Sequence, residues 1–206
     1  MFDFLKSHHC YEDDDRRKLI RRILFSILAL ASLVLFVIIL ILIILRPAKP
    51  RFTLRDASLY TFNLSSSGEL LSPTLNLTMQ ITLSAHNPND QIGVFYRSLD
   101  VYVSYRGQQV SLTVALPPSY QDHHDITVWS PYLYGIAVPV PPYDVDALRE
   151  DQNTGAVMLK VVVEGSVKWK VASWVSGTYH MHVNCPAYIR LAGGRIDGIQ
   201  SCGVDV

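Results

Sequence analysis

The side chains best suited to chemistry in this 206-residue chain are histidines, and they occur at three places. Residues 122–125 read Asp-His-His-Asp, the densest group of metal-capable side chains. Adjacent histidines on one loop rarely reach the same ion, and no further ligand stands at a metal-site spacing. His180 and His182 alternate with apolar residues, as on the wet face of a strand. His86 precedes an Asn-Pro pair, where a turn role suffices, so we predict no metal site.

Catalytic motifs are missing from the sequence. It contains no P-loop, no glycine-rich dinucleotide pattern, no His-Glu-x-x-His, no Gly-x-Ser-x-Gly and no Cys-x-x-Cys. Serine, histidine and aspartate are all present, but nothing in their spacing predicts a triad. The net charge is zero, without the positive excess expected of a nucleic-acid binder. We therefore predict a protein that is not an enzyme, uses no cofactor and binds no nucleic acid.

Two modification chemistries are suggested by spacing. Asn63-Leu64-Ser65 and Asn76-Leu77-Thr78 are both acceptor patterns for N-glycosylation. Cys185 and Cys202 are the only cysteines after residue 45 and could form a disulfide in an oxidising compartment. Closing a loop of this size would stabilise the fold by about 3 kcal/mol in the chain-entropy model. The alternative is that Cys185 is a small buried apolar residue.

A long apolar segment precedes all of these residues. Ile23–Leu45 contains no charged residue, proline or glycine. As a helix it would be about 34 Å long, slightly more than the hydrocarbon core of a bilayer. Cleaved signal peptides have shorter apolar cores and a small-residue cleavage site, and this segment ends at Arg46-Pro47 instead. We predict an uncleaved signal anchor, with a long cleaved signal as the alternative.

The flanking charges predict the orientation of this anchor. Five Lys or Arg residues lie just before it and four just after it, which favours a cytosolic N-terminus. Both glycosylation patterns follow the anchor, in agreement with that orientation. The predicted parts are a cytosolic basic tail (1–22), a transmembrane anchor (23–45), a Pro-containing spacer (46–51) and an extracytosolic domain (52–206).

Beyond the spacer, apolar residues recur with period two, which predicts strands. The clearest set is Leu75, Leu77, Met79, Ile81, Leu83 and Ala85. Arg106-Gly107-Gln108 predicts a hairpin turn, and Gly165 predicts a bulge in the strand that leads to Val171. Only 144–152 has a helical pattern, with Asp144 or Asp146 as its N-cap. Short strands with little helix predict an antiparallel β-sandwich.

Several stretches, taken in order, resemble one plant family. They include Asn87-Pro88-Asn89, Gly93, Tyr96, Trp169 and the ending that starts at Cys202. Together with the anchor, they are similar to the harpin-induced-like, disease-resistance-like membrane proteins, whose outer part is a late-embryogenesis-abundant type 2 domain. Ser119 departs from the family pattern, in which an aromatic residue is usual at this position.

The resemblance implies a seven-stranded sandwich, a plasma-membrane location and a role in plant defence and the hypersensitive response. It supplies no catalytic residues. We expect a non-catalytic module that contacts the membrane bilayer and a protein partner. Assembly with itself or with another chain is left open.

The runner-up function is lipid handling at the membrane surface, since such sandwiches can open an apolar groove. A long apolar groove would favour lipid handling. A closed core with an exposed aromatic patch would favour partner binding.

Overall fold

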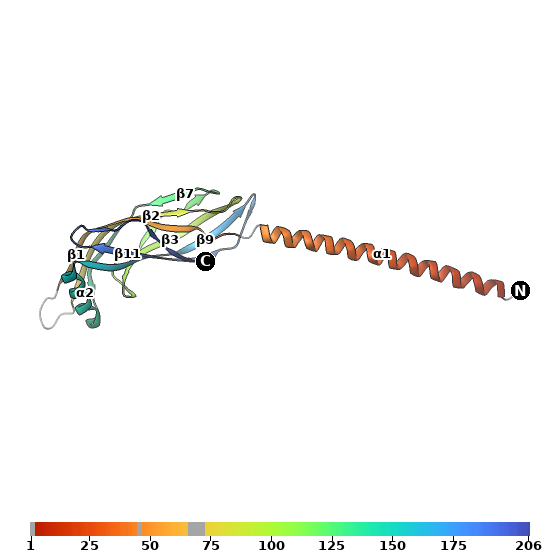
Figure 1. The fold of residues 1–206 in the computed structure, drawn as a ribbon, viewed down its shortest axis with the longest axis horizontal. Coiled ribbons are helices and arrows are strands. Elements are labelled where there is room, and N and C mark those ends of the chain that lie inside the picture. Colours follow the sequence, from red (N-terminus) through yellow and green to blue (C-terminus); the bar gives the residue numbers. More distant parts are fainter. Residues whose placement is uncertain (1–2, 45–46, 66–72) are drawn as a thin grey trace. The chain divides into compact units, whose positions relative to one another are not determined.

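The computed structural model describes residues 3–44, 47–65 and 73–206. The chain divides into two compact units, residues 1–46 and 47–206 (Figure 1). The predicted end of the anchor at Leu45 and the predicted start of the spacer at Arg46 lie outside the described residues.

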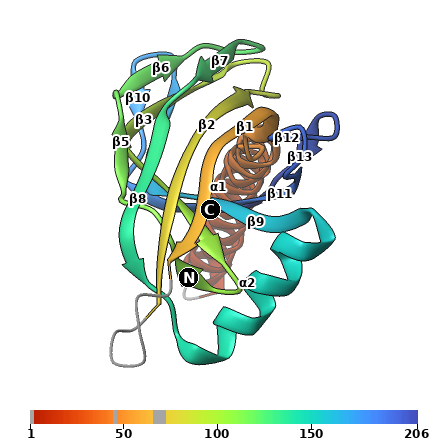
Figure 2. The same cartoon turned by 90° about the vertical axis from the view of Figure 1, so that its left-hand side faces the viewer.

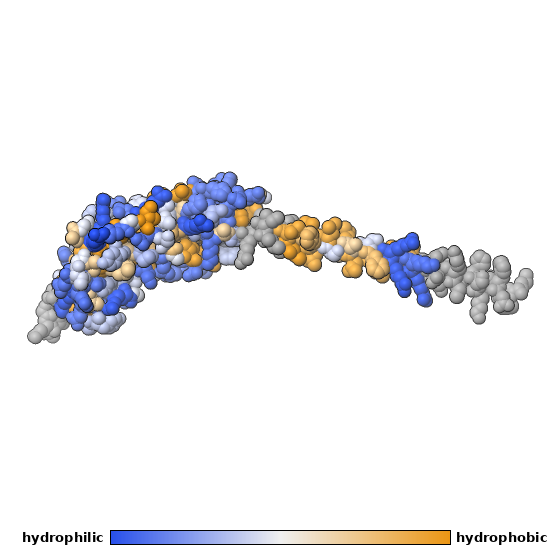
Figure 3. Space-filling model, viewed as in Figure 1, coloured by the Kyte–Doolittle hydropathy of each residue, from blue (hydrophilic) through white to orange (hydrophobic). Residues whose placement is uncertain are grey.

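The first unit is built on a single helix, α1 (Asp3–Ile44). It contains a 25-residue stretch, Arg16–Leu40, whose length and composition suit a membrane span, and none of that stretch is buried. Figure 3 shows apolar side chains along most of this stretch and a band of hydrophilic ones at its N-terminal end. The N-terminal apolar helix thus suggests membrane anchoring. The segment predicted as a basic tail is part of the same helix from Asp3 onward.

The second unit is mainly β, and all of its strand pairs are antiparallel. The long strands are β1 (Arg51–Ser65), β2 (Thr74–His86), β3 (Ile92–Tyr105), β8 (Tyr132–Pro139), β9 (Ala156–Val171) and β11 (Tyr179–Arg190). The short ones are β4 (Gln108–Gln109), β5 (Val114–Leu116), β6 (Ser119–Gln121), β7 (Ile126–Trp129), β10 (Trp174–Val175), β12 (Arg195–Ile196), β13 (Gln200–Ser201) and β14 (Gly203–Asp205).

The predicted count of seven strands is wrong. Within the described residues fourteen strands join one hydrogen-bonded sheet, with β4-β3-β9-β11-β12-β1-β2-β7 as its main path. Several edge segments are only two or three residues long, and a period-two pattern cannot reveal a strand of that length. The sheet curls, as Figure 2 shows from β8 and β2 through β1 to β11 and β9. Antiparallel, mainly β structure is confirmed, whereas a two-sheet sandwich stays a prediction.

The core consists of the inward residues of the long strands. The predicted inward set of β2 is fully buried, from Leu75 to Ala85. Phe52, Tyr96 and Trp129, from β1, β3 and β7, have ring centroids 5.6–6.4 Å apart, so the curl brings these distant strands into contact. Such aromatic contacts add to the stabilisation from apolar burial.

Helix α2 (Pro142–Thr154) covers the region predicted as 144–152, but its cap differs from the prediction. The N-cap is Pro141, and no side chain caps the helix. Asp144 is buried instead, with its Oδ1 3.7 Å from Nη1 of Arg106. Proline has no backbone N–H, so a proline in the first turn leaves one donor fewer to be satisfied. The helix can therefore begin without a capping side chain.

The bulge predicted at Gly165 lies on the opposite strand. The register between β3 and β9 shifts between Tyr96 and Ser98, which places the extra residue, Arg97, on β3. Gly165 pairs with Leu99, and a Cβ added to it would collide with the carbonyl oxygen of Ser98. The glycine therefore allows a close backbone approach beside the bulge.

We predict that Gly165→Ala lowers the free energy of unfolding by about 2 kcal/mol, because the new methyl group overpacks a backbone contact. Thermal unfolding of the detergent-solubilised full chain measures the effect. Gly177→Ala is the matched control, since nothing lies within 4 Å of its added Cβ. Equal melting temperatures for the two variants would contradict the close-approach role.

Candidate functional site

The interior of the β unit is filled by packed side chains. Core residues such as Leu83, Val101 and Val183 are fully buried. The hydroxyl of Tyr96 donates to Oε1 of Gln121 at 2.8 Å, and burial raises the pKa of this tyrosine. The amide of Gln121 in turn donates to the backbone oxygen of Ala85 at 2.8 Å. The deepest polar groups are thus satisfied within the protein.

Exposed tyrosines gather on the outside of the sheet, over β1, β2 and β8. Tyr60, Tyr132 and Tyr134 are 60%, 46% and 43% exposed. The ring centroids of Tyr60 and Tyr132 are 6.3 Å apart, as are those of Tyr132 and Tyr134, with interplanar angles of 30° and 19°. Thr78 and Gln80 of β2 lie between them in the sheet register. These five residues are called the tyrosine face.

The tyrosine face was not predicted from the sequence. Tyr132 and Tyr134 have the i, i+2 spacing of one strand face, which could have indicated half of it. Tyr60 is the extra residue of a bulge in β1, between Leu59 and Thr61. A bulge changes the facing of the residues around it, so alternation along β1 could not assign Tyr60 to this face.

Asn87 and Asn89, two residues of the family motif, form a network of amide hydrogen bonds. Asn87 is fully buried, and its Nδ2 donates to the backbone oxygens of Ile92 at 2.7 Å and Asp122 at 3.0 Å. Its Oδ1 accepts from Nδ2 of Asn89 at 2.8 Å. Asn89 also pairs with both backbone groups of Ala48, at 2.7 and 2.9 Å. The motif thus joins its own loop, the first residue of β3 and the loop after β6 to the segment that leads into β1.

This network changes the description of the predicted spacer. Ala48 is bonded to Asn89, and Pro50 is buried in the β unit. Lys49 Nζ lies 3.7 Å from Oδ1 of Asp205, near the C-terminus. Residues 48–50, which the sequence placed in a stiff Pro-containing spacer, therefore have contacts within the folded unit.

The two glycosylation patterns lie side by side. Asn63 of β1 and Asn76 of β2 are direct register partners. Asn63 is exposed, whereas Asn76 is half-buried and its Oδ1 accepts from the backbone N–H of Ala137 at 2.8 Å. Ala137 has a positive φ of 49° at a bulge in β8. Asn76 therefore has a structural partner that Asn63 lacks among the described hydrogen bonds.

Cys185 and Cys202 are joined by a disulfide, with their sulfur atoms 1.98 Å apart. Cys185 is fully buried on β11. Cys202 stands between β13, which pairs with β1, and β14, which pairs with β11. The bond thus links the C-terminal segment to the core where two long strands meet.

The chain has relatives among known plant proteins. The late embryogenesis abundant protein family matches residues 82–186. NDR1/HIN1-like protein 1 of Arabidopsis thaliana is 46% identical over 184 residues, covering 89% of this chain and 86% of the relative. The chain belongs to the NDR1/HIN1-like family. NDR1/HIN1-like protein 12 of the same plant is also 46% identical, covering 83% of this chain and 79% of the relative.

The crystal structure of a protein from Archaeoglobus fulgidus can be superposed on this chain with a TM-score of 0.30 and 9% sequence identity. The match covers 62% of this chain and 95% of the other chain. A likeness of this degree adds nothing to the family assignment.

The remaining motif residues of this NDR1/HIN1-like chain have packing roles. A Cβ on Gly93 would collide with the Tyr120 ring. The ring centroids of Tyr120 and Phe95 are 4.5 Å apart. Trp169 is 5% exposed, and its backbone N–H donates to Oγ of Ser176 at 2.9 Å. In the described part of the chain the buried Oγ of Ser119 has no hydrogen-bond partner.

Three histidines of this NDR1/HIN1-like chain each lie near a single carboxylate, whereas no ion pair is described for His86 or His180. The rings of His123 and His124 lie 2.8 Å from Asp122 and 2.7 Å from Asp90. The backbone and ring of His123 lower the pKa of the Asp122 carboxyl. His182 lies 3.5 Å from Glu164. Over residues 3–44, 47–65 and 73–206, no three His, Cys, Asp or Glu side chains are placed to hold a metal ion.

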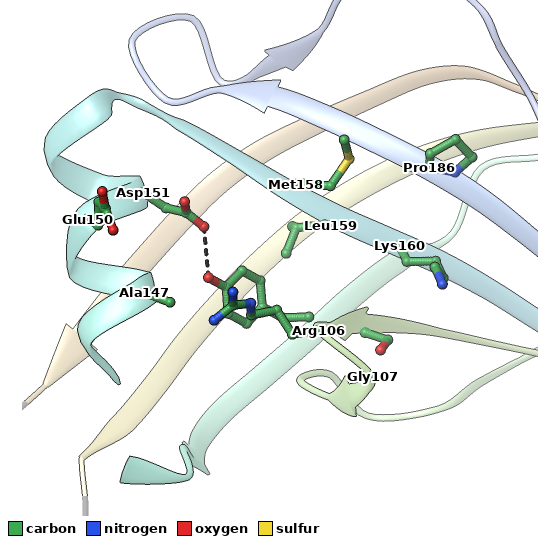
Figure 4. A pocket seen from close by; sticks show the side chains of 11 residues that line it. Arg106, Gly107, Ala147, Glu150, Asp151, Met158, Leu159, Lys160 and Pro186 are labelled. Carbon is green, nitrogen blue, oxygen red and sulfur yellow. Dashed lines mark hydrogen bonds between the residues drawn. The ribbon is translucent and has the colours of Figure 1, made fainter. Parts of the chain in front are cut away.

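A surface pocket of about 660 Å³ lies between α2 and the strands β3 and β9 (Figure 4). The hydroxyl of Tyr105 donates to Oδ2 of Asp151 at 2.8 Å, the bond dashed in Figure 4. Burial, and then this carboxylate, raise the pKa of Tyr105, so it stays protonated. Lys160 and Glu150 add opposite charges to the lining. The bond between Tyr105 and Asp151 connects β3 to α2 and helps to hold the helix against the sheet.

We predict that Asn87→Ala lowers the free energy of unfolding by about 3 kcal/mol, because the carbonyls of Ile92 and Asp122 lose their buried donor. Thermal unfolding of the full chain in detergent measures the loss. Asn153→Ala, at an exposed position on α2, is the control and should leave the melting temperature unchanged. If both variants melt alike, the amide network does not hold the unit together.

Proposed function

We propose that this chain is a non-catalytic module of plant defence and hypersensitive-response signalling, anchored in the plasma membrane with its N-terminus in the cytosol. The β unit then lies outside the cell and presents a surface to a partner. We expect this partner to be a protein. The observation that carries the proposal is the exposed tyrosine face over a closed core. Membership of the NDR1/HIN1-like family is consistent with the defence role.

The absence of site chemistry among the described residues supports a binding role over a catalytic one. Each candidate histidine that has a described ion-pair partner lies near one exposed carboxylate. The pocket beside α2 is lined by residues of both charge signs. Large exposed aromatic groups on a rigid sheet are typical of binding surfaces, since their burial on association is favourable.

Lipid handling, the alternative, requires an apolar groove. The inward side chains of the long strands are packed in the core, and those of Leu54, Leu77 and Val161 are 1% exposed or less. Opening a groove would expose such side chains at about 25 cal/mol per Å². The filled interior therefore argues for binding on the outside of the sheet.

The anchor is tested by replacing Ile23–Leu45 with a cleavable signal. We expect the secreted β unit to fold but to lose activity several-fold in a pathogen assay, because tethering raises its effective concentration at the membrane. His123→Ala and His182→Ala in the full chain are controls that should keep full activity. Equal activity of secreted and anchored forms would reject tethering, and loss through one histidine alone would reject the non-catalytic role.

Topology is tested by glycosylation. We predict that an N-glycosidase increases the gel mobility of the protein from plant membranes, and that Asn63→Gln removes most of this shift. Asn76→Gln should remove little, because Asn76 is half-buried and bonded to Ala137. Asn153→Gln, outside any acceptor pattern, is the control. No shift, together with cytosolic access to residues after Pro47, would reverse the proposed orientation.

A further inference from the structure

The tyrosine face has a specific chemical character, namely aromatic rings among neutral hydrogen-bonding groups. Tyr60 donates its hydroxyl to Oε1 of Gln80 at 3.2 Å. Thr78 is the register partner of Tyr134, and Gln80 is the partner of Tyr132. The face thus alternates apolar rings with amide and hydroxyl groups over three neighbouring strands.

Charge is absent from the strands that carry most of this face. Neither β2 nor β8 contains Asp, Glu, Lys or Arg. By register the nearest charged residues are Arg195 of β12, which pairs with Ser58 beside Gln80, and Asp56 of β1, which pairs with Thr82. A phosphate, a nucleic acid or a charged lipid head group would need a cluster of cations, which β2 and β8 do not supply.

Ordinary sheet packing does not account for the arrangement of the rings. Cross-strand aromatic pairs stabilise neighbouring strands, but Tyr60 and Tyr132 lie on β1 and β8 with β2 between them. Tyr60 reaches this position at a bulge, and a second bulge in β8 bounds the face near Ala137. Bulges re-aim side chains and are common beside binding sites.

We propose that the tyrosine face binds a neutral polysaccharide chain. Sugar rings have apolar C–H faces that pack on aromatic rings, and hydroxyl edges that bond to amides and hydroxyls. The Tyr132 ring centroid lies 6.3 Å from those of both Tyr60 and Tyr134, which places three exposed rings within reach of one extended chain.

This inference rests on the proposed function, because it names the partner of the same outer surface. The two glycosylation acceptors lie on the same surface of the sheet as the tyrosine face. Asn76 precedes Thr78 by two residues on β2, and Asn63 is the register partner of Asn76. The chain's own N-glycan is therefore the nearest competitor for the face.

The test is retention of the full-length protein, in lipid nanodiscs, on microcrystalline cellulose and on immobilised xyloglucan. We expect retention that is insensitive to salt, and no retention on polygalacturonate, which is charged. Tyr132→Ala with Tyr134→Ala should reduce retention about tenfold or more, as loss of a binding hot spot does. Tyr188→Ala is the matched control, an equally exposed strand tyrosine outside the face.

Lack of retention of the wild type, or equal retention of the double tyrosine variant, would overturn the proposal. Retention seen only after N-glycosidase treatment would also overturn it, because the protein's own glycan would then occupy the face. The pathogen assay distinguishes failure of the polysaccharide proposal from failure of the proposed function. If the double variant loses defence activity although the wild type is not retained, the face serves a protein partner and the interaction module stands.

Discussion

The structure depends on one constraint, that alternate residues of each long strand point into a single closed core. Along β2 every second side chain from Leu75 to Ala85 is buried, and the partner strands fill the remaining space. An interior of this kind has no room for a ligand without unfolding part of the sheet. Function is therefore left to the outward positions, to the loops and to the ends of the chain.

Departures from strand regularity decide what the outward positions present. The bulge in β1 contributes Tyr60 to a group whose other members lie two strands away, and the bulge in β8 is held by the amide of Asn76. The bulge in β3 is accommodated by a glycine on the opposite strand. The bulges in β8 and β3 thus each meet a specific residue of the neighbouring strand.

Both ends of the β unit are tied to its core. Asn89 holds Ala48, at the start of the unit, and the disulfide holds Cys202, near its end. Lys49 and Asp205 then lie 3.7 Å apart, so the entering and leaving segments are neighbours. The first residues of the folded unit are therefore held in place relative to the sheet.

The sequence alone determined the apolar helix, the antiparallel β character, the inward residues of β2 and the family, because these depend on periodicity, length and ordered local motifs. It also indicated helix α2, although the predicted N-cap, Asp144 or Asp146, differs from the observed one, Pro141. Tertiary structure decided the number and order of strands, the attachment of Ala48 and Pro50 to the folded unit, the side-by-side position of Asn63 and Asn76, and the tyrosine face. These features depend on which strands pair and in which register, and a bulge shifts that register by one residue without a sign in the local pattern.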